Sequence, residues 1–494
     1  MSGAESRRAW WTLAGACAGL FLLMLDSTVV ALALPELQKD LGVSATGLQW
    51  VLNGYLLVVA ILVVSAGRLG DMFGRKRVFL AGMAVFAAGS AISGGADGEV
   101  TIVAGRAVQG AGAAAMLPLS LALVCDAFPA AQQPRALGIW AAVSAIALAI
   151  GPLAGGLLVS ADWRIIFWIN LPVAAAGFAV TALAARESTD PAAGHRIDLA
   201  GLITLTVGMG AFVLAIVQSR AWGWESPLTL GMLFGGCAVL AAFWLVEHRV
   251  SGPIVDFSLF RNGPYFGASA AAFALVGSYW TVMFYQPQYL QNVQGHTPVQ
   301  SGLLILPVTL PMVFISPFSG PLIARFGARW LMTAGMLCGV AGTLVLTRIG
   351  YDTGYPVLLA GYLLFGIALG LVYSPMSTAA MEAMPPEKSG IASGVLAMVR
   401  VLAGAVGLAV TGAVFHLFEA DRLDALRSSS AFSGDLAGRA FSYALASSTW
   451  ISVGILAVGA VLTWTFVRDT EPAAAEAGER RPEHHQHHRK FHLA

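Results

Sequence analysis

Charged side chains are scarce in this sequence of 494 residues, of which 11% are Asp, Glu, Lys or Arg and 57% are hydrophobic. A typical soluble domain carries about 25% charged residues. A chain with so little charge cannot cover its apolar surface in water, so we expect the lipid bilayer to be its solvent. The formal net charge of +1 gives no support for a nucleic-acid partner.

Other chemistry-bearing patterns are also missing. The four cysteines lie singly in apolar runs, so neither a disulfide framework nor a metal site is expected. No Gly-x-x-x-x-Gly-Lys-Ser/Thr stretch occurs, so ATP is not the expected energy source and no cofactor is predicted. No Ser or His joins the buried charges described below into a catalytic set, which argues against an enzyme.

Long apolar runs dominate what is present. About 20 apolar residues suffice for one membrane crossing. We predict fourteen spanning helices, near residues 11–34, 48–67, 78–96, 100–124, 136–160, 164–185, 198–219, 228–246, 266–289, 301–324, 330–348, 356–382, 391–415 and 441–467. The first run is of membrane length and contains Asp26, so it is interpreted as a spanning helix and not as a cleaved signal peptide.

The cations are distributed unevenly between the two sides that these spans define. Nineteen of the 28 Lys and Arg residues fall on the side of the N-terminus and seven on the other, while Arg106 and Arg400 lie within spans. Because cytoplasmic loops carry the excess of cations, both termini are predicted to be cytoplasmic. The Ala-, Gly- and Arg-rich composition indicates the cytoplasmic membrane of a bacterium.

The chain repeats itself at a shift of 253 residues. This shift aligns Gly67-Arg68-Leu69…Phe73-Gly74 with Gly320-Pro321-Leu322…Phe326-Gly327. We therefore expect an all-α polytopic membrane protein with an N-terminal six-helix bundle (1–185), a linker with two inserted spans (186–264), a C-terminal six-helix bundle (265–467) and a disordered cytoplasmic tail (468–494). Two related bundles suit alternating access to a site between them.

The most informative stretch is the charged turn Gly67–Arg77 between two apolar runs. Asp71 and Arg75 are four residues apart, so they can face the cytoplasmic end of the fourth span, where Asp126 lies. The glycines, Gly67 and Gly74 among them, indicate tight helix contact, which favours a gating role. The alternative is that these charges only set the topology.

Asp26 and Arg106 are ionisable groups inside spans, and such groups are functional candidates by default. Burial opposes the ionised form of Asp26 and a nearby cation favours it, so the carboxyl can load and release a proton. Arg106 is the predicted cation. Asp26 could instead stay ionised and only hold the arginine, and Arg106 could instead reach the external surface.

The fifth span contains Gly151-Pro152-Leu153-Ala154-Gly155-Gly156. Proline kinks a membrane helix and glycines permit close approach to a neighbour, although simple packing would need the same residues. Aromatic and Met side chains with few polar groups suit an apolar aromatic cargo. The tentative substrate-binding residues are Met24, Trp50, Asn53, Tyr279, Trp280, Tyr285, Tyr373, Met376 and Arg400.

Four motifs together resemble those of the major facilitator superfamily. They are Leu25-Asp26-Ser27-Thr28, the turn Gly67–Arg77, Arg106-Ala107-Val108-Gln109-Gly110 and Gly151–Gly156. Within that superfamily, the four motifs are most similar to those of the fourteen-helix drug:proton antiporters. The resemblance implies a proton-driven exporter of hydrophobic or amphipathic drugs or antibiotics. It also implies that Asp26 and Arg106 take part in proton coupling. The residues that it implies for cytoplasmic gating are Gly67, Asp71, Gly74, Arg75 and Asp126.

Within this resemblance, Gly151, Pro152, Gly155 and Gly156 form the motif that marks exporters among the major facilitators. That motif argues against the alternative of an importer or uniporter. A transporter dedicated to one metabolite or one self-made antibiotic remains the alternative to a multidrug pump. The expected partners are the small-molecule substrate, protons and the bilayer, and the expected state is a monomer. A membrane receptor is disfavoured because residues 468–494 are too short and polar for a signalling domain.

Overall fold

A computed structural model describes residues 3–129, 132–189, 198–250, 255, 257–384, 389–428 and 435–468. Nearly all of these residues are helical. The helices are α1 Gly3–Leu41, α2 Ala45–Phe73, α3 Arg75–Gly94, α4 Glu99–Ala127, α5 Gln133–Ala161, α6 Ile165–Trp168, α7 Asn170–Ala184, α8 Leu199–Trp222, α9 Pro227–Glu247, η1 Phe257–Arg261, α10 Gly263–Gln288, η2 Tyr289–Val293, α11 Pro298–Ile305, η3 Leu306–Val308, α12 Leu310–Ile315, η4 Ser316–Phe318, α13 Ser319–Phe326, α14 Ala328–Leu346, α15 Tyr355–Glu382, α16 Ser389–Ser428 and α17 Leu436–Phe466. The predicted tail lies outside the described residues apart from Arg468.

Short polar side chains begin several of these helices. Ser44 accepts a hydrogen bond from Gly47 N at the start of α2, and Asn262 accepts one from Tyr265 N at the start of α10. Thr297 forms a capping box with Gln300 at the start of α11. Such caps satisfy amides that have no partner inside the helix, so they fix where each membrane helix begins.

Twelve helices in the described residues are long and apolar enough to cross a membrane. A thirteenth is gained if the pair Ala142–Leu148 and Ile150–Ala161, bent by 43°, is one span. The bend lies just before Pro152, which removes a backbone donor and crowds the carbonyl four residues earlier. The structure therefore confirms an all-helical, multi-pass fold without confirming fourteen spans.

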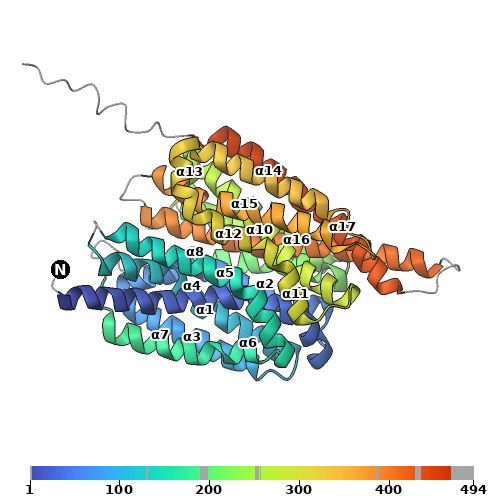
Figure 1. The fold of residues 1–494 in the computed structure, drawn as a ribbon, viewed down its shortest axis with the longest axis horizontal. Helices are drawn as coiled ribbons and strands as arrows, with labels where there is room; N and C mark the ends of the chain where they lie inside the picture. Colours follow the sequence, from blue (N-terminus) through green and yellow to red (C-terminus); the bar gives the residue numbers. More distant parts are fainter. Residues whose placement is uncertain are drawn as a thin grey trace, which may run out of the picture.

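The missing span is the predicted helix at residues 301–324. The structure divides this stretch among α11, η3, α12, η4 and α13. Pro307 and Pro311 each lie in the first turn of a new short helix. Proline is favoured there and disrupts a helix interior, which explains why an apolar run of membrane length does not form one continuous helix. In Figure 1 these short helices still run from one end of the molecule toward the other.

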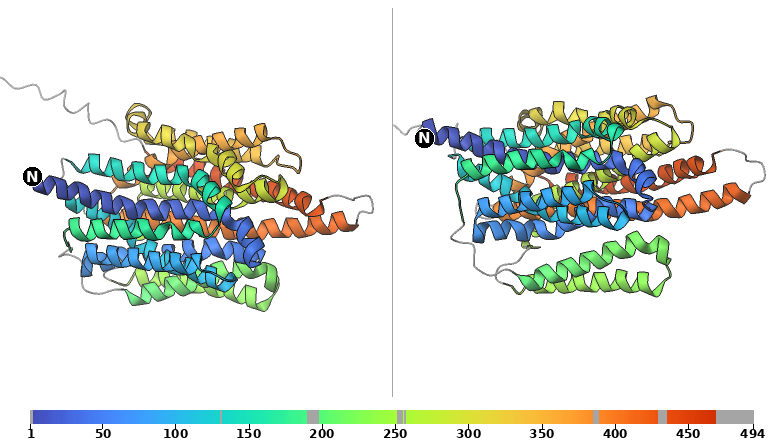
Figure 2. Two further views of the ribbon diagram at one scale, coloured as in Figure 1. Left: turned by 60° about the horizontal axis from the view of Figure 1, so that its bottom comes forward. Right: turned by 90° about the horizontal axis from the view of Figure 1, so that it is seen from below.

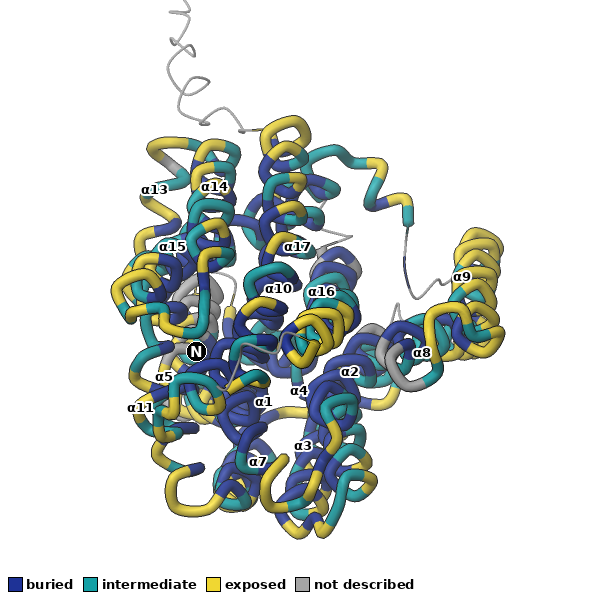
Figure 3. The backbone as a smooth tube through the Cα atoms, turned by 90° about the vertical axis from the view of Figure 1, so that its right-hand side faces the viewer, coloured by how far each residue is buried: buried dark blue, intermediate teal, exposed yellow. Residues whose placement is uncertain are grey.

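Most helices run along the long axis, and the N-terminus lies at the same end of the molecule as the end of α17 (Figure 1). Helices α1–α7 lie together, as do α10–α17 (Figure 3). The α8–α9 hairpin stands beside these helices (Figure 2). It is attached through α8, whose Val213 and Ile216 pack with Leu57 of α2 and Ala409 of α16.

Burial separates inner from outer helices. In the most apolar window of α1 and of α10, 83% of the residues are buried inside the protein, against 17% in α9. Figure 3 shows the same contrast, with α9 largely exposed. In a bilayer the exposed apolar faces contact lipid, so α1 and α10 are the helices best placed to carry polar chemistry.

The sequence repeat is visible in the backbone. Gly74 separates α2 from α3 with φ 114°, and Gly327 separates α13 from α14 with φ 81°. Each glycine N–H donates to the carbonyl four residues earlier, at Gly70 and Ile323. Positive φ favours glycine, so the two equivalent turns keep the same residue for the same reason.

Candidate functional site

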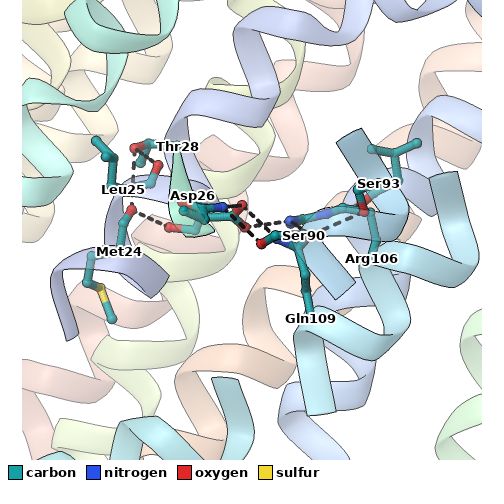
Figure 4. A network of polar contacts seen from close by, with 11 residues as sticks. Met24, Leu25, Asp26, Thr28, Ser90, Ser93, Arg106 and Gln109 are labelled. Atoms are coloured by element: carbon teal, nitrogen blue, oxygen red, sulfur yellow. Dashed lines mark hydrogen bonds and ion pairs between the residues drawn. The ribbon is translucent and has the colours of Figure 1, made fainter. Parts of the chain in front are cut away.

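Asp26 of α1 faces Arg106 of α4 in the interior of the helix bundle (Figure 4). Arg106 Nη1 lies 2.5 Å from Asp26 Oδ2, and neither side chain is exposed. A lone charge at this depth would be very costly, so each group compensates the other. The structure thus places Arg106 in the interior and not at the external surface.

Helix α2 holds the other side of the guanidinium group. Arg106 Nε donates to the Val51 carbonyl at 3.0 Å, and Arg106 Cζ lies 4.3 Å from the centroid of the Tyr55 ring. Arg106 Nη2 is buried and has no acceptor among the residues that the structure describes. The arginine is therefore fixed by α1, α2 and α4 together and keeps one donor atom available.

The second carboxylate oxygen of Asp26 accepts from two amides. Gln109 Nε2 and Asn170 Nδ2 each lie 3.1 Å from Asp26 Oδ1, and both amides also donate to Ser90 Oγ. With Arg106, three side chains donate hydrogen bonds to the carboxylate. The resulting network joins α1, α3, α4 and α7.

Gln109, Asn170 and Ser90 were not predicted as site residues. Gln109 follows Arg106 by three residues, so the two share a helix face, and Arg106 Nη1 donates to Gln109 Oε1 at 2.8 Å. The spacing could have revealed Gln109. Asn170 and Ser90 are single polar residues in apolar helices, and only the packing of α3 and α7 against α1 assigns them to the site.

A second polar group lies at the end of the bundle that holds the N-terminus. Arg75 Nε lies 2.9 Å from Asp71 Oδ1, and Arg75 Nη1 lies 2.6 Å from Asp126 Oδ1. Ser188 Oγ donates to Asp126 Oδ2 at 2.5 Å, and Ser188 O accepts from Arg75 N at 2.9 Å. We call Asp71, Arg75, Asp126 and Ser188 the charged-turn cluster. It connects α2, α3, α4 and the segment after α7, and Ser188 was not predicted.

The glycines of the turn differ in their surroundings. A Cβ atom at Gly70 would overlap the Leu119 side chain of α4, whereas one at Gly67 would lie 3.6 Å from Pro118 Cβ, an ordinary contact. Gly74 has a positive φ, and a Cβ there would lie 2.5 Å from Glu187 Oε1. Close helix approach therefore depends on Gly70, while Gly74 is required by the turn.

The glycines of Gly151–Gly156 face two different neighbours. A Cβ at Gly151 would overlap Thr28 Oγ1, and one at Gly155 would lie 3.2 Å from Val29 Cα, so these glycines bring α5 against α1. A Cβ at Gly156 would lie 2.7 Å from the Pro298 carbonyl of α11. One short motif thus packs within the first group of helices and also against the second.

The tentative substrate residues do not all gather at one place. Trp50 packs against the apolar cluster that contains Leu57 of α2 and Val213 of α8. Tyr285 stacks on Phe415, with ring centroids 4.5 Å apart. Met376 is completely buried, Trp280 is 8% exposed, and Met24 is only partly buried. Asn53 is fully buried, and neither of its amide atoms has a partner in the described part of the chain.

Two of these residues are associated in the second group of helices. Arg400 Cζ of α16 lies 4.9 Å from the centroid of the Tyr373 ring of α15. Arg400 Nη2 also donates to Ser377 Oγ of α15 at 2.5 Å. The structure therefore brings Arg400 and Tyr373 together.

Comparison with known sequences gives a consistent result. The Major Facilitator Superfamily profile matches residues 16–408. The multidrug resistance protein Stp of Mycobacterium tuberculosis is 38% identical over 82% of this chain and 75% of its own length. The puromycin resistance protein pur8 of Streptomyces alboniger is 33% identical over 96% of this chain and 94% of its own. The tetracenomycin C resistance and export protein of Streptomyces glaucescens is 34% identical over 82% of this chain and 76% of its own.

Solved structures agree at the level of the fold. A bacterial homologue of the human lysosomal transporter Spinster superposes with a TM-score of 0.66 over 94% of this chain and 99% of its own, at 16% identity. The POT family transporter PepTSo gives a TM-score of 0.64 over 92% and 98%, at 17% identity. From the matched sequence and the shared fold, the chain belongs to the Major Facilitator Superfamily, a family of membrane transporters and not of enzymes.

Proposed function

We propose that this protein is a proton-coupled antiporter that exports hydrophobic or amphipathic drugs or antibiotics across the bacterial cytoplasmic membrane by alternating access. The observation that carries the proposal is the buried Asp26–Arg106 pair, because a titratable acid at membrane depth is the simplest carrier for a proton. Several relatives are named for antibiotic resistance or export, which supports this class of cargo.

The membrane arrangement that we propose has fourteen crossings and both termini in the cytoplasm. The short helices α11–α13 count as one crossing because together they run along the long axis as the neighbouring helices do (Figure 1). The excess of 19 cations over seven supports the orientation. We divide the chain into bundles 1–185 and 265–467, with 186–264 as an inserted pair of spans, acting as a monomer.

The contacts between the two bundles lie near the loops at the end opposite the N-terminus. Gln291 Nε2 donates to the Leu32 carbonyl at 3.2 Å, and Gln49 Nε2 lies 3.1 Å from His416 Nε2. Gly156 adds the close approach of α5 to α11. With the proposed topology this end is external, so the conformation is closed toward the outside. Opening requires these contacts to separate.

Proton coupling then follows from the hydrogen bonds of Asp26. Three donors hold the carboxylate in the observed conformation, and a proton must share its two oxygens with them. Protonation also removes the negative charge that compensates Arg106. Proton binding is therefore linked to a shift of α1 relative to α4, the two helices that carry the pair.

The charged-turn cluster provides the proposed cytoplasmic gate. Its three charged members belong to the first bundle, and with Ser188 they tie the α2–α3 turn to α4 and to the segment after α7. The cluster keeps this end of the first bundle rigid, so that it can close against the second bundle as one unit. At the 253-residue shift, alanines occupy the positions of Asp71, Arg75 and Asp126, so the proposed gate is asymmetric.

Transport in inverted membrane vesicles tests the proposal. The vesicles are acidified inside by respiration, and puromycin or tetracenomycin C is added to the wild type and to Asp26→Asn. We expect drug-dependent proton release from the wild type only. Proton release by Asp26→Asn equal to that of the wild type would exclude Asp26 as the proton carrier.

Some relatives are named for a single compound, such as the methylenomycin A resistance protein of Streptomyces coelicolor. A transporter dedicated to one compound is therefore the second candidate. A susceptibility panel in an efflux-deficient host separates the two, because a multidrug exporter raises tolerance to unrelated compounds and a dedicated exporter raises tolerance to one scaffold.

A further inference from the structure

Arg400 is a cation within a membrane span, and the described residues supply it with no acid. It lies eleven residues after the start of α16, about 16 Å along the helix axis at 1.5 Å per residue. Between Ser389 and Phe418 it is the one Asp, Glu, Lys or Arg residue of the sequence. It also lies inside the candidate span Gly394–Ser428.

The protein satisfies Arg400 only in part. Arg400 Nη2 donates to Ser377 Oγ of α15 at 2.5 Å, and the guanidinium group covers the Tyr373 ring. Arg400 Nε is buried with no acceptor among the described residues, none of which forms an ion pair with Arg400. Arg106 differs in this respect, because its guanidinium group has the Asp26 carboxylate at 2.5 Å.

The buried donor of Arg400 indicates an acceptor that comes from outside the chain. A buried donor on a charged group is costly when it has no partner. Among the described residues, α15 offers Arg400 the Ser377 hydroxyl and the Tyr373 ring, and neither contacts Arg400 Nε.

The two helices involved suit a cargo site. Helices α15 and α16 lie together in the second group of helices (Figure 3). Among the described residues, Arg106 of the first bundle is paired with an acid, whereas Arg400 of the second contacts a hydroxyl group and an aromatic ring.

We propose that Arg400 and Ser377 form a subsite for the acidic group, such as a carboxylate, sulfonate or enolate, of an aromatic amphipathic cargo, with Tyr373 against its apolar body. The inference rests on the proposed export function and names its substrate class.

Two probes with the same aromatic body test the subsite. 8-Anilinonaphthalene-1-sulfonate carries an anion and N-phenyl-1-naphthylamine does not. Binding is measured on the full-length protein in lipid nanodiscs, with empty nanodiscs subtracted. We expect the wild type to bind the sulfonate about tenfold more tightly, since a hydrogen bond to a charged group contributes about 1.5–3 kcal/mol.

The variants separate a cargo subsite from a structural role. Arg400→Gln should weaken sulfonate binding about tenfold and change binding of the neutral probe less than twofold. Ser377→Ala should weaken only sulfonate binding, and it decides the matter if Arg400→Gln does not fold. Arg348→Gln removes an exposed cation of the second bundle and should have no effect.

Equal affinity of the wild type for both probes, no binding of either, or parallel losses for both in the variants would overturn the subsite. Proton-driven uptake of N-phenyl-1-naphthylamine into inverted vesicles tests the export function separately. Uptake with no preference for the sulfonate would leave the export function standing and remove the subsite, whereas preference for the sulfonate without uptake would remove the export function.

Discussion

Asp26 illustrates how an acid is kept inside a membrane helix. Burial alone would make its charge very unfavourable, but Arg106, Gln109 and Asn170 place three donors on the carboxylate. The donors belong to α4 and α7, so the contacts of the carboxylate depend on how these two helices pack against α1. At this scale the chemistry depends on side-chain contacts and less on the overall fold.

Asp26→Asn should reduce proton-driven efflux to background. It should also destabilise the protein, because loss of one member of a buried pair costs about 3–5 kcal/mol. The double variant Asp26→Asn/Arg106→Gln removes both charges and should recover much of the thermal stability without recovering efflux. Stability is measured by tryptophan fluorescence during heating, and recovery of transport in the double variant would mean that the pair is only structural.

Asp71→Asn should slow turnover, whereas Lys76→Gln should have little effect. Asp71 is one of two carboxylates that hold Arg75, while Lys76 Nζ donates to the Ala182 carbonyl and forms no ion pair among the described residues. The native Cys125, adjacent to Asp126, reports on the gate in a variant without the other three cysteines. We expect a water-soluble thiol reagent to label it faster in Asp71→Asn. Unchanged labelling together with normal transport would contradict the gating role and would mean that the charged turn only sets the topology.

Helix α5 shows how one element serves two partners. Gly151 and Gly155 contact α1, and Gly156 contacts α11, so α5 lies between the proton-carrying helix and the second bundle. Small residues allow this because backbones can approach closely where no side chain intervenes. We infer that α5 slides on both neighbours during alternation.

Gly155→Leu should lower efflux at least tenfold while cargo binding is retained. The added side chain would meet Val29 of α1 and hold the two helices apart. Gly235→Leu in α9 is the matched control, because a Cβ there meets no atom within 4 Å. Rates are compared at equal amounts of protein in vesicles. Wild-type efflux by Gly155→Leu would show that close α1–α5 contact is not needed.

At the scale of the whole molecule, the two bundles touch through few polar contacts near one end. Gln49 and His416 form one of them, across α2 and α16. In alternating access such contacts must break in every cycle. A covalent link at this position should therefore stop transport without disturbing either bundle.

Gln49→Cys/His416→Cys, joined by a short bis-methanethiosulfonate, should lose efflux and regain it after reduction. The single-cysteine variants treated in the same way are the controls and should keep efflux. Cargo binding from the cytoplasmic side should persist in the linked protein, because only the end opposite the N-terminus is held closed. Undiminished efflux in fully linked protein would contradict a movement at this end.

The sequence determined the class of the molecule. Low charge and long apolar runs dictate a helical membrane protein, since only helices and closed barrels satisfy the backbone in lipid. Local patterns were equally decisive at Gly74 and Gly327, where positive φ requires glycine. The pairing of Asp26 with Arg106 was expected because a buried charge needs a partner of opposite sign.

Tertiary structure decided what depends on contacts between distant segments. The division of the apolar run at residues 301–324 is not such a case, because the prolines that cause it are in the sequence and only a count of apolar residues overlooks them. Asn170 and Ser90 join the Asp26 site only because α7 and α3 pack beside α1. Trp50 packs with α8 while Tyr373 lies under Arg400, since the direction of a side chain follows from helix packing.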